Sequence, residues 1–225
     1  MNGLFITGTD TGVGKTHVTC AIAKSLRPNV LAMKPIATGA TWAHDRFLSD
    51  DTCALAEACD ADYDSVTQWS FPQPVAPAVA ARLNGVSLTI DALTIAVRKQ
   101  IRPGRRVLVE GVGGLLCPLT DHDTVADWIV ALSMPTIIVA RRSLGTLNHT
   151  LLTLEVAKHR GLKVRGVVIS ETAPVSDLAD ETNVEELRRR IDVPILAVLP
   201  YQSPGVENVA LNGVDWLALM TSEDR

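Results

Sequence analysis

One stretch near the start of the chain, LFITGTDTGVGKTHVTCAIAKSL (residues 4–26), constrains the fold more than any other. A short apolar run that indicates a buried strand leads into a glycine-rich turn, and the turn leads into a helical pattern. The backbone amides of such a turn, together with the free amides of a helix N-terminus, favour a bound phosphate. The stretch therefore predicts a phosphate-binding loop (P-loop) between a first strand and a first helix.

The glycine spacing of this loop differs from the usual pattern. Four residues normally separate the first glycine from Gly-Lys-Ser/Thr, which would put it at position 9, but Thr9 stands there and the glycine is Gly8. We expect Lys15 to reach the β- and γ-phosphates and the Thr16 hydroxyl to bind Mg²⁺. The residues expected to bind nucleotide are Gly8, Thr9, Asp10, Thr11, Gly12, Val13, Gly14, Lys15 and Thr16. The alternative, a helix start with incidental glycines, is opposed by the correct order of strand, turn, Gly-Lys-Thr and helix.

Apolar runs and helical patterns alternate along the rest of the chain. Strands are predicted at 4–7, 30–35, 106–111, 135–140, 164–170 and 194–200. Helices are predicted at 14–27, 50–59, 88–101, 124–132, 146–160 and 180–191, with a capping box at Thr124-Val125-Ala126-Asp127. The order predicts an α/β fold of the P-loop NTPase type, a mainly parallel sheet with helices on both faces in three α/β/α layers. We expect one domain over residues 1–225, with an irregular stretch at 36–85.

Composition narrows the class of protein. A net charge of −4 gives no reason to expect a nucleic acid or an anionic membrane as partner. No apolar stretch approaches the roughly 20 residues of a membrane span, and the first residues run straight into a strand without a leader pattern. The four cysteines form no Cys-x-x-Cys pair, so we expect reduced, mostly buried thiols rather than zinc ligands. These features predict a cytoplasmic protein.

A lysine stands where the second predicted strand ends. In AMKPIATG, Lys34 closes the strand and Thr38 follows on the loop. Ligands of open α/β sheets bind beyond the carboxyl ends of the strands. Lys34 is therefore a candidate to bind a phosphate or a substrate anion, although a lone lysine at a strand end is also a common surface residue.

Two carboxylates are candidates for a metal site. In RRVLVEGVGG, Glu110 ends an apolar strand and is followed by three glycines in four residues. An acid at a strand end commonly helps to hold Mg²⁺ in P-loop proteins. Asp51 could supply a second carboxylate, although Ser49, Asp50 and Asp51 also form a typical N-cap cluster.

A second turn that opens a helix lies in RRSLGTLNHTLLTLE. Free amides at 145–148 could bind a carboxylate, and Asn148 could add a side-chain donor. The alternative is plain N-capping by Ser143 or Thr146. We interpret His149 as structural.

Four of these stretches together resemble the dethiobiotin synthetase family: TGTDTGVGKT, KPIATG, VEGVGGLLCPL and LGTLNHTLLTLE. The displaced glycine is a feature of that family's loop. The resemblance also extends through FPQPVAPAVAA and ADW, and it covers residues 3 to about 170, whereas the C-terminal part matches only loosely.

The resemblance implies an ATP- and Mg²⁺-dependent carboxylation and ring closure of 7,8-diaminononanoate (7,8-diaminopelargonate) with CO₂, the penultimate step of biotin synthesis. A substrate amine forms a carbamate, the carbamate attacks the γ-phosphate, and the second amine closes the ring of dethiobiotin and expels phosphate. ADP is the other product. The partners implied are small molecules and a second copy of the chain.

The resemblance also implies roles for individual residues. Lys15, Lys34 and Thr11 would be catalytic, and Thr16, Asp51 and Glu110 would hold Mg²⁺. Family enzymes are homodimers that hold the substrate carboxylate at the subunit interface. The substrate-binding residues implied are Thr38, Leu144, Gly145, Thr146, Leu147 and Asn148.

Three positions depart from the family pattern. Gly12 stands where some members carry an acid. Arg141 and Arg142 add charge at a strand end, where they either contact anions or remain exposed. Ser170 and Glu171 replace an asparagine that contacts the base in some members, which leaves the nucleotide preference open.

Other classes of P-loop protein are less well matched. A partition-type switch ATPase typically carries Lys-Gly-Gly early in the loop, where this chain has Thr9-Asp10-Thr11. A cobyrinate-type synthetase usually needs a glutaminase domain, for which 225 residues leave no room. A degenerate pseudoenzyme is opposed by the presence of Lys15, Thr16, Lys34 and Glu110.

Overall fold

The computed structural model describes residues 2–175, 177–201 and 213–221. In these residues the central sheet has six strands in the order β10-β9-β8-β1-β7-β2, and every neighbouring pair is parallel. The strands are β1 (Gly3–Gly8), β2 (Val30–Met33), β7 (Arg106–Glu110), β8 (Thr136–Arg141), β9 (Val164–Ser170) and β10 (Ile195–Leu199). Each predicted strand is present, with ends that differ by at most two residues.

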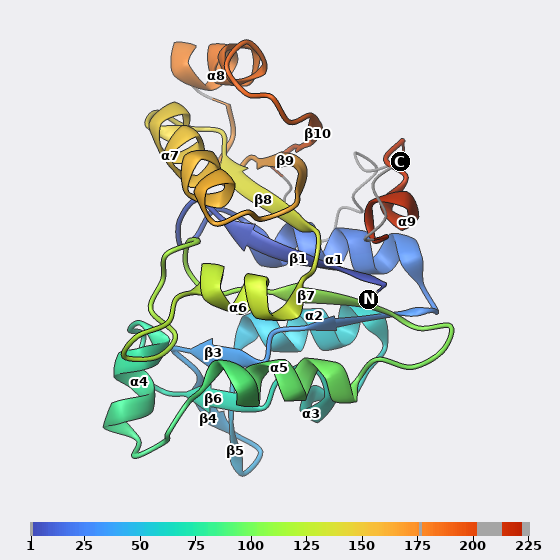
Figure 1. Ribbon diagram of the computed structural model, residues 1–225, viewed down its shortest axis with the longest axis vertical. Coiled ribbons are helices and arrows are strands. Elements are labelled where there is room, and N and C mark those ends of the chain that lie inside the picture. The colour runs from blue at the N-terminus through green and yellow to red at the C-terminus, as the bar shows by residue number, and fades with distance from the viewer. Residues whose placement is uncertain (1, 176, 202–212, 222–225) are drawn as a thin grey trace.

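Helices cover both faces of the sheet. They are α1 (Lys15–Leu26), α2 (Asp50–Cys59), α3 (Tyr63–Val66), α4 (Pro77–Leu83), α5 (Ile90–Lys99), α6 (Val125–Leu132), α7 (Thr146–His159), α8 (Leu178–Arg188) and α9 (Trp216–Leu219). Figure 1 shows α1 and α2 packed together behind the sheet, with α5, α6 and α7 in front of it. The three-layer α/β/α arrangement predicted from the sequence is confirmed.

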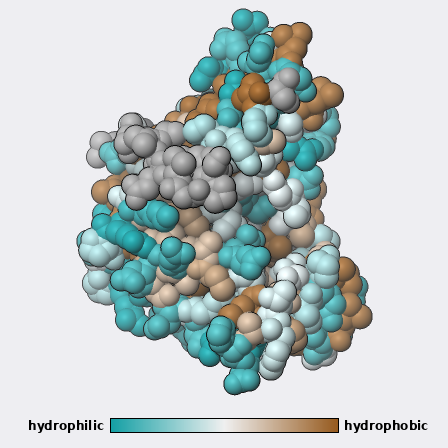
Figure 2. Space-filling view, turned by 180° about the vertical axis from the view of Figure 1, so that it is seen from behind, coloured by the Kyte–Doolittle hydropathy of each residue, from teal (hydrophilic) through white to brown (hydrophobic). Residues whose placement is uncertain are grey.

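The core lies between these layers and is mostly aliphatic. The central strand β1 is buried along its whole length, as a parallel strand covered on both faces should be. Phe5 of β1 meets Trp128 of α6 edge to face, with ring centroids 5.1 Å apart. Figure 2 shows the opposite face of the molecule, where hydrophobic residues form separate areas among polar ones.

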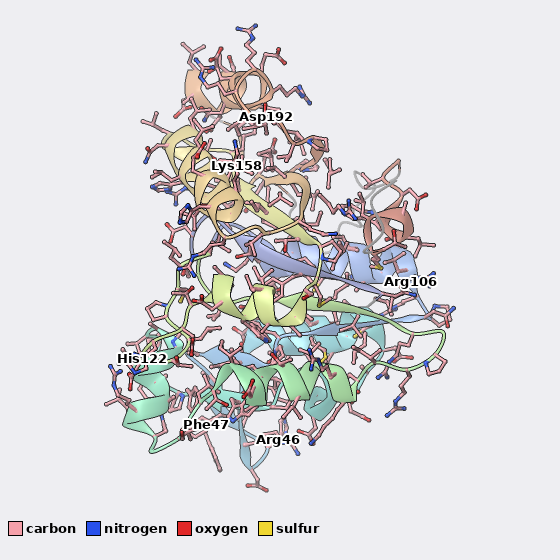
Figure 3. The ribbon with its side chains drawn as sticks, in the orientation of Figure 1. Arg46, Phe47, Arg106, His122, Lys158 and Asp192 are labelled. Atoms are coloured by element: carbon pink, nitrogen blue, oxygen red, sulfur yellow. The ribbon has the colours of Figure 1, made fainter. Side chains whose placement is uncertain are left out.

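The prediction that residues 36–85 are irregular is wrong in part. Besides α2, this segment forms α3, α4 and the short strands β3 (Ile36–Thr38), β4 (Thr41–Ala43), β5 (Arg46–Leu48) and β6 (Trp69–Phe71). β3 pairs with β6, while β4 and β5 form a hairpin. Such three-residue strands are too short to show a periodic pattern. In Figure 3, Arg46 and Phe47 of this hairpin lie at one end of the molecule, and Asp192 lies near the other end.

The strand order creates a switch point at β1. From β1 the chain passes through α1 to β2, which lies at one edge of the sheet. The strand β8 lies next to β1 in the direction of the other edge. Loops that leave neighbouring strands in opposite directions open a crevice at the carboxyl ends of those strands. The loop that follows β1 therefore lies at the usual position for a ligand in this class of sheet.

The capping box at the start of α6 is confirmed. The Asp127 carboxylate accepts a hydrogen bond from the backbone N–H of Thr124 at 2.8 Å and pairs with Arg160 at 2.6 Å. Partial burial alone would raise the pKa of Asp127, but the hydrogen bonds from Thr124 and the charge of Arg160 hold the pKa below its ordinary value of 3.8.

Replacing Asp127 by alanine is expected to lower the free energy of unfolding by about 1 kcal/mol, because a helix cap is lost. Since the folded-state pKa is depressed, this stabilisation is present above pH 3.8 and disappears as the pH falls through the folded-state value. Urea denaturation at pH 7 and below pH 3 measures both effects. Asp91→Ala, in the exposed first turn of α5, is the control; an equal loss in both variants would contradict the capping role.

Among the described residues, no helix is long and apolar enough to cross a membrane. The prediction of a single domain over residues 1–225 extends to residues 1, 176, 202–212 and 222–225, which lie outside the described part of the chain, and it stays a prediction.

Candidate active site

A cleft of about 580 Å³ opens at the carboxyl ends of the central strands. It brings together segments far apart in the sequence: the loop after β1, the end of β2, the start of α2 and the turn before α4. The lining residues are Thr11, Gly12, Gly14, Lys15, Thr16, Lys34, Thr38, Asp51, Pro74, Val75, Ala76, Pro77, Val112, Gly113 and Cys117.

The displaced glycine of the loop has a steric cause. A Cβ atom on Gly8 would lie 2.8 Å from Cγ2 of Val13 and 3.1 Å from Cδ of Lys15. The loop therefore folds back over Gly8, and the Lys15 side chain passes directly above it. The Lys15 ammonium donates a hydrogen bond to the Asp10 carbonyl at 2.9 Å, which holds the lysine against its own loop. Because no side chain fits at position 8, the glycine is required there.

Gly14, which immediately precedes α1, is constrained in two ways. Its φ of 89° lies in the left-handed region, which side chains disfavour. A Cβ atom at this position would also lie 2.3 Å from Oγ of Ser170 at the end of β9. The start of α1 is thus pressed against β9, and only glycine permits this contact.

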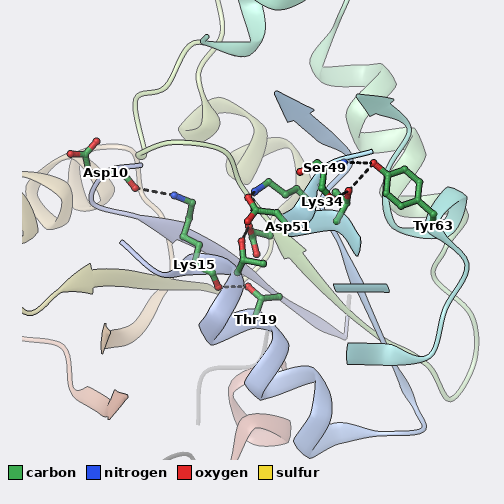
Figure 4. A network of polar contacts seen from close by, with 10 residues as sticks. Asp10, Lys15, Thr19, Lys34, Ser49, Asp51 and Tyr63 are labelled. Atoms are coloured by element: carbon green, nitrogen blue, oxygen red, sulfur yellow. Dashed lines mark hydrogen bonds and ion pairs between the residues drawn. The ribbon is translucent and has the colours of Figure 1, made fainter. Parts of the chain in front are cut away.

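Beside the loop, Lys34 reaches two carboxylates; Figure 4 shows its ammonium against Asp51, while the Lys15 ammonium points to Asp10. The Thr16 hydroxyl donates to Oε1 of Glu110 at 2.8 Å, and the Lys34 ammonium donates to the same oxygen at 2.9 Å. Lys34 also contacts Oδ2 of Asp51. Glu110 is fully buried, and the Lys34 side chain is 7% exposed. The predicted residues of the β2 end, the β7 end and the α2 start therefore form one hydrogen-bonded cluster.

The two lysines have different electrostatic environments. Burial lowers the pKa of Lys15 below its ordinary value, and the nearby charge of Lys34 adds to this effect. Burial alone would also lower the pKa of Lys34, but the charges of Glu110 and Asp51 outweigh burial and raise it. Of the two, only Lys34 has carboxylate partners in direct contact within the described part of the chain. Lys15 holds a buried positive charge suited to an incoming anion.

The cluster has the donor set of a magnesium site. Mg²⁺ prefers one or two carboxylates together with phosphate oxygens and water. Asp51 and Glu110 supply the carboxylates and Thr16 a hydroxyl. Within the described residues, Oε2 of Glu110 is buried without a hydrogen-bond partner, which is costly unless a ligand uses it. No group of three or more His, Cys, Asp or Glu side chains in the described part of the chain is placed to hold a metal ion.

The start of α2, which carries Asp51, is held by Tyr63. The Tyr63 hydroxyl accepts a hydrogen bond from the backbone N–H of Ser49 at 3.1 Å and lies 2.8 Å from the Thr52 hydroxyl. It also lies 3.0 Å from the Ser70 hydroxyl. Ser49 occupies the N-cap position without a side-chain capping bond, so an N-cap cluster alone does not account for Asp51, which faces Lys34.

Replacing Tyr63 by phenylalanine is expected to lower the free energy of unfolding by about 1–2 kcal/mol, because the Ser49 amide loses a part-buried partner. We also expect a several-fold rise in the Mg²⁺ concentration that gives half-maximal activity, since Asp51 is less firmly positioned. Thermal melts and Mg²⁺ titrations measure the two effects. Tyr201→Phe, at a side chain that is 47% exposed, is the control; an unchanged Mg²⁺ requirement in Tyr63→Phe would contradict the positioning role.

Four residues of the predicted nucleotide loop are not among those that line the cleft in the part of the chain that the structure describes: Gly8, Thr9, Asp10 and Val13. The other predicted residues fall into two groups. Thr11 and Thr38 line the cleft, whereas residues 144–148 lie outside the set that lines it in the described chain. Gly145 occupies the N-cap position of α7 with φ 92°, and no side-chain capping bond is made there, so capping by Ser143 or Thr146 is not what the structure shows. Leu144 beside it is 78% exposed. The expectation of free amides over 145–148 is wrong at Thr146, which is buried and whose backbone N–H donates to the Ser143 carbonyl at 3.0 Å. The neighbouring residues Leu144, Gly145 and Asn148 are exposed.

Two of the departures noted in the sequence, Arg142 and Glu171, contact each other. Arg142 pairs with Glu171 at 2.5 Å and donates to the Asp180 carbonyl at 2.6 Å. Of the two alternatives for Arg141 and Arg142, exposure is not what the structure shows, because both residues are half-buried. Glu171 also accepts from the backbone N–H of Tyr201 at 2.9 Å, so both of its oxygens are engaged.

Sequence reasoning missed part of the cleft wall. Residues 74–77 form one side of it and Val112, Gly113 and Cys117 another. The closely spaced prolines of FPQPVAP were the available signal for the first side.

The expectation of mostly buried thiols is also wrong: all four cysteines are free, but only Cys59 is buried. Burial raises the pKa of Cys117, so a neutral thiol faces the cleft.

Comparison with known proteins identifies the family. A family model described as an AAA domain matches residues 2–208. The ATP-dependent dethiobiotin synthetase BioD of Anaeromyxobacter dehalogenans (strain 2CP-1 / ATCC BAA-258) is 41% identical over 207 residues, which cover 90% of this chain and 91% of the relative. The chain belongs to the dethiobiotin synthetase family. Another dethiobiotin synthetase, from Pseudoalteromonas translucida (strain TAC 125), is 35% identical and covers 94% of this chain and 100% of the relative.

Solved structures resemble this member of the dethiobiotin synthetase family in fold alone. A ParA family ATPase from Chlorobium tepidum TLS has a TM-score of 0.54 at 15% identity, covering 90% of this chain and 86% of that one. The MinC:MinD cell division protein complex of Aquifex aeolicus gives a TM-score of 0.52 at 14% identity, covering 90% of this chain and 82% of the other. The predicted P-loop fold is confirmed. At such low identity the likeness carries no argument for a partition function.

Proposed function

We propose that the chain is an ATP-dependent dethiobiotin synthetase, which carboxylates 7,8-diaminononanoate with CO₂ and closes the ureido ring at the expense of ATP. The observation that carries the proposal is the pair of buried lysines in one cleft. Lys15 extends from the phosphate-binding loop, and Lys34 extends from the end of β2, between two carboxylates. The relatives in this family are named for dethiobiotin synthesis, a reaction to which this arrangement is suited.

The proposed reaction has three bond-forming steps. One amine of the substrate adds to CO₂ and loses a proton, which gives a carbamate. A carbamate oxygen then attacks the γ-phosphorus of ATP, and the bond to ADP breaks. Finally, the second amine attacks the carbonyl carbon of the carbamic–phosphoric anhydride and loses a proton, the C–O bond breaks, and phosphate leaves as dethiobiotin forms. No covalent bond to the protein is needed, so alignment and charge stabilisation supply the catalysis.

The roles of the residues follow from their positions. Lys15 would neutralise the transferred phosphoryl group, and Lys34 would neutralise the carbamate. Thr11 and Thr38, at the wall of the same cleft, would contact carbamate and substrate. Thr16, Asp51 and Glu110 would hold Mg²⁺, which when bound supplies positive charge to the phosphate oxygens.

The remaining part of the substrate site is proposed to come from a second subunit. Residues 144–148 lie outside the cleft and present the N-terminus of a fourteen-residue helix at the surface. Such a helix start suits a carboxylate. In a homodimer this turn would reach the partner's cleft and bind the carboxylate of the diamine substrate there. We place the enzyme in the cytoplasm, where its small-molecule substrates and ATP are available.

Isotope labelling tests the reaction. The purified protein is incubated with MgATP, ¹³C-bicarbonate and 7,8-diaminononanoate, and the product is identified by mass and by the ¹³C chemical shift. The proposal predicts dethiobiotin labelled at the ureido carbon alone. Absence of labelled dethiobiotin, with the protein folded and ATP bound, would contradict it.

A further inference from the structure

The ammonium group of Lys34 contacts both of the carboxylates assigned to Mg²⁺. It donates to Oε1 of Glu110 at 2.9 Å and contacts Oδ2 of Asp51. The same Oε1 atom accepts the Thr16 hydroxyl at 2.8 Å. Glu110 and Asp51 thus contact Lys34 directly, and the third proposed ligand, the Thr16 hydroxyl, donates to the same Glu110 oxygen as Lys34 does.

This arrangement satisfies a charge requirement in the free protein. Glu110 is fully buried, and a buried carboxylate without a nearby positive charge is strongly unfavourable. The other lysine of the cleft does not meet this need through contact, because the Lys15 ammonium is bonded to the Asp10 carbonyl. Lys34 is the cation in direct contact with both carboxylates.

We propose that Lys34 is the resident counter-ion of the metal site, which Mg²⁺ displaces when it enters with the nucleotide. This inference rests on the proposed function for the identity of the metal ligands. The ammonium and a divalent cation compete directly for Oε1 of Glu110 and Oδ2 of Asp51. A cation that bound first at Oε2 of Glu110, which has no hydrogen-bond partner among the described residues, would still lie against the ammonium on the same carboxylate, and the two positive charges repel each other at that distance. Metal binding therefore breaks the ion pairs of Lys34.

The exchange has two consequences for the reaction. Without nucleotide, the protein binds divalent cations weakly, because each cation must first displace Lys34. With the nucleotide, phosphate oxygens add to the metal's ligands and favour the exchange. The released ammonium remains in the cleft that Lys34 lines, and is then free to turn to an anionic reacting group. Binding of the metal and release of the Lys34 ammonium toward the reacting group therefore occur together.

Direct cation binding tests the proposal without any turnover. Binding of Mn²⁺ to nucleotide-free protein is measured from the loss of the free-ion signal in electron paramagnetic resonance, for wild type and for Lys34→Met. The methionine keeps an unbranched apolar stem and removes the charge. We expect Lys34→Met to bind Mn²⁺ about tenfold or more tightly than wild type, because both carboxylates become free of their competitor.

Two matched variants separate this effect from general electrostatics. Lys24→Met removes one positive charge from an exposed position on the same helix as Lys15, and it should leave the affinity unchanged. Lys15→Met removes the other cleft lysine, which makes no direct contact with the carboxylates, and its effect should be smaller than that of Lys34→Met. Equal affinities in wild type and Lys34→Met would overturn the proposal, as would an equal gain in Lys24→Met.

A melting experiment covers the case in which Lys34→Met folds poorly without metal. The proposal predicts that Mg²⁺ raises the Tm of Lys34→Met relative to EDTA, and does so far more than for wild type, because the metal replaces the missing ammonium. Equal Mg²⁺ shifts in the two proteins would overturn it. Dethiobiotin synthesis by the wild type is measured separately: synthesis together with an unchanged Mn²⁺ affinity in Lys34→Met would refute this inference and leave the function intact. A tenfold gain in affinity without synthesis would refute the function alone.

Discussion

Replacement of Lys15 by alanine is expected to lower the rate of dethiobiotin formation by about 1000-fold or more, because the loop loses the cation that neutralises the transferred phosphoryl group. Lys15 is 7% exposed and has only the Asp10 carbonyl as a hydrogen-bonded partner among the contacts of its ammonium described above. Its burial lowers its pKa, and a bound phosphate would reverse that shift. Single-turnover measurement of dethiobiotin with saturating ATP removes product release from the measured rate.

The control for this prediction is Lys24→Ala, an exposed lysine on the same helix. Its rate should remain within about twofold of wild type, because surface substitutions away from a site have small effects. Circular dichroism and the melting temperature establish that Lys15→Ala is folded. A folded Lys15→Ala enzyme with more than a tenth of the wild-type rate would rule out the assigned role.

The second large effect is expected from Glu110→Gln. The side chain is fully buried at the end of β7, and its Oε1 atom accepts hydrogen bonds from both Thr16 and Lys34. An amide of the same shape removes the negative charge that a metal needs and that Lys34 requires as a partner. We expect the rate to fall about 100-fold to 1000-fold at ordinary Mg²⁺ concentrations. We also expect the free energy of unfolding to fall by about 3 kcal/mol, because the change removes the negative partner of a buried ion pair and leaves the lysine charge in place.

Asp51→Asn provides the matched comparison for Glu110→Gln. The Asp51 side chain is 48% exposed, so solvent screens its own charge, and Lys34 keeps the buried Glu110 as its partner after the change. Both variants should need more Mg²⁺ for activity, but Asp51→Asn should lose much less stability. Mg²⁺ titrations of activity and urea denaturation in EDTA measure the two quantities. An unaltered Mg²⁺ requirement in Glu110→Gln would exclude this carboxylate as a metal ligand.

The fold was predictable wherever the apolar runs were long. Strands such as β8 and β9 are buried over several consecutive residues, and the helices between them have clear ends marked by glycine, proline or capping residues. The short strands β3 to β6 were not predictable. Each has three residues and is stabilised by the strand it pairs with and by tertiary packing. Local sequence pattern does not report such partners.

The candidate site was predictable as a list of residues, but its contacts were not. The motif rules placed Lys15 and Thr16 on the loop, and the strand-end rule placed Lys34 and Glu110 at the same edge of the sheet. The rules contain no information on side-chain direction, and thus could not show that Lys34 bonds to both carboxylates. The requirement for Gly8 likewise arises from the path of Val13 and Lys15 over it, which is a property of the folded loop.

The central claim, that this cleft couples phosphoryl transfer to ring closure, is tested most directly by the stoichiometry of phosphate release. The purified protein is supplied with MgATP and bicarbonate, with and without 7,8-diaminononanoate, and phosphate and dethiobiotin are measured in the same samples. Our account predicts that phosphate release depends on the diamine and that one phosphate appears for each dethiobiotin. Phosphate release that is indifferent to the diamine, with no dethiobiotin formed, would contradict the account and would indicate an ATPase that acts on another partner.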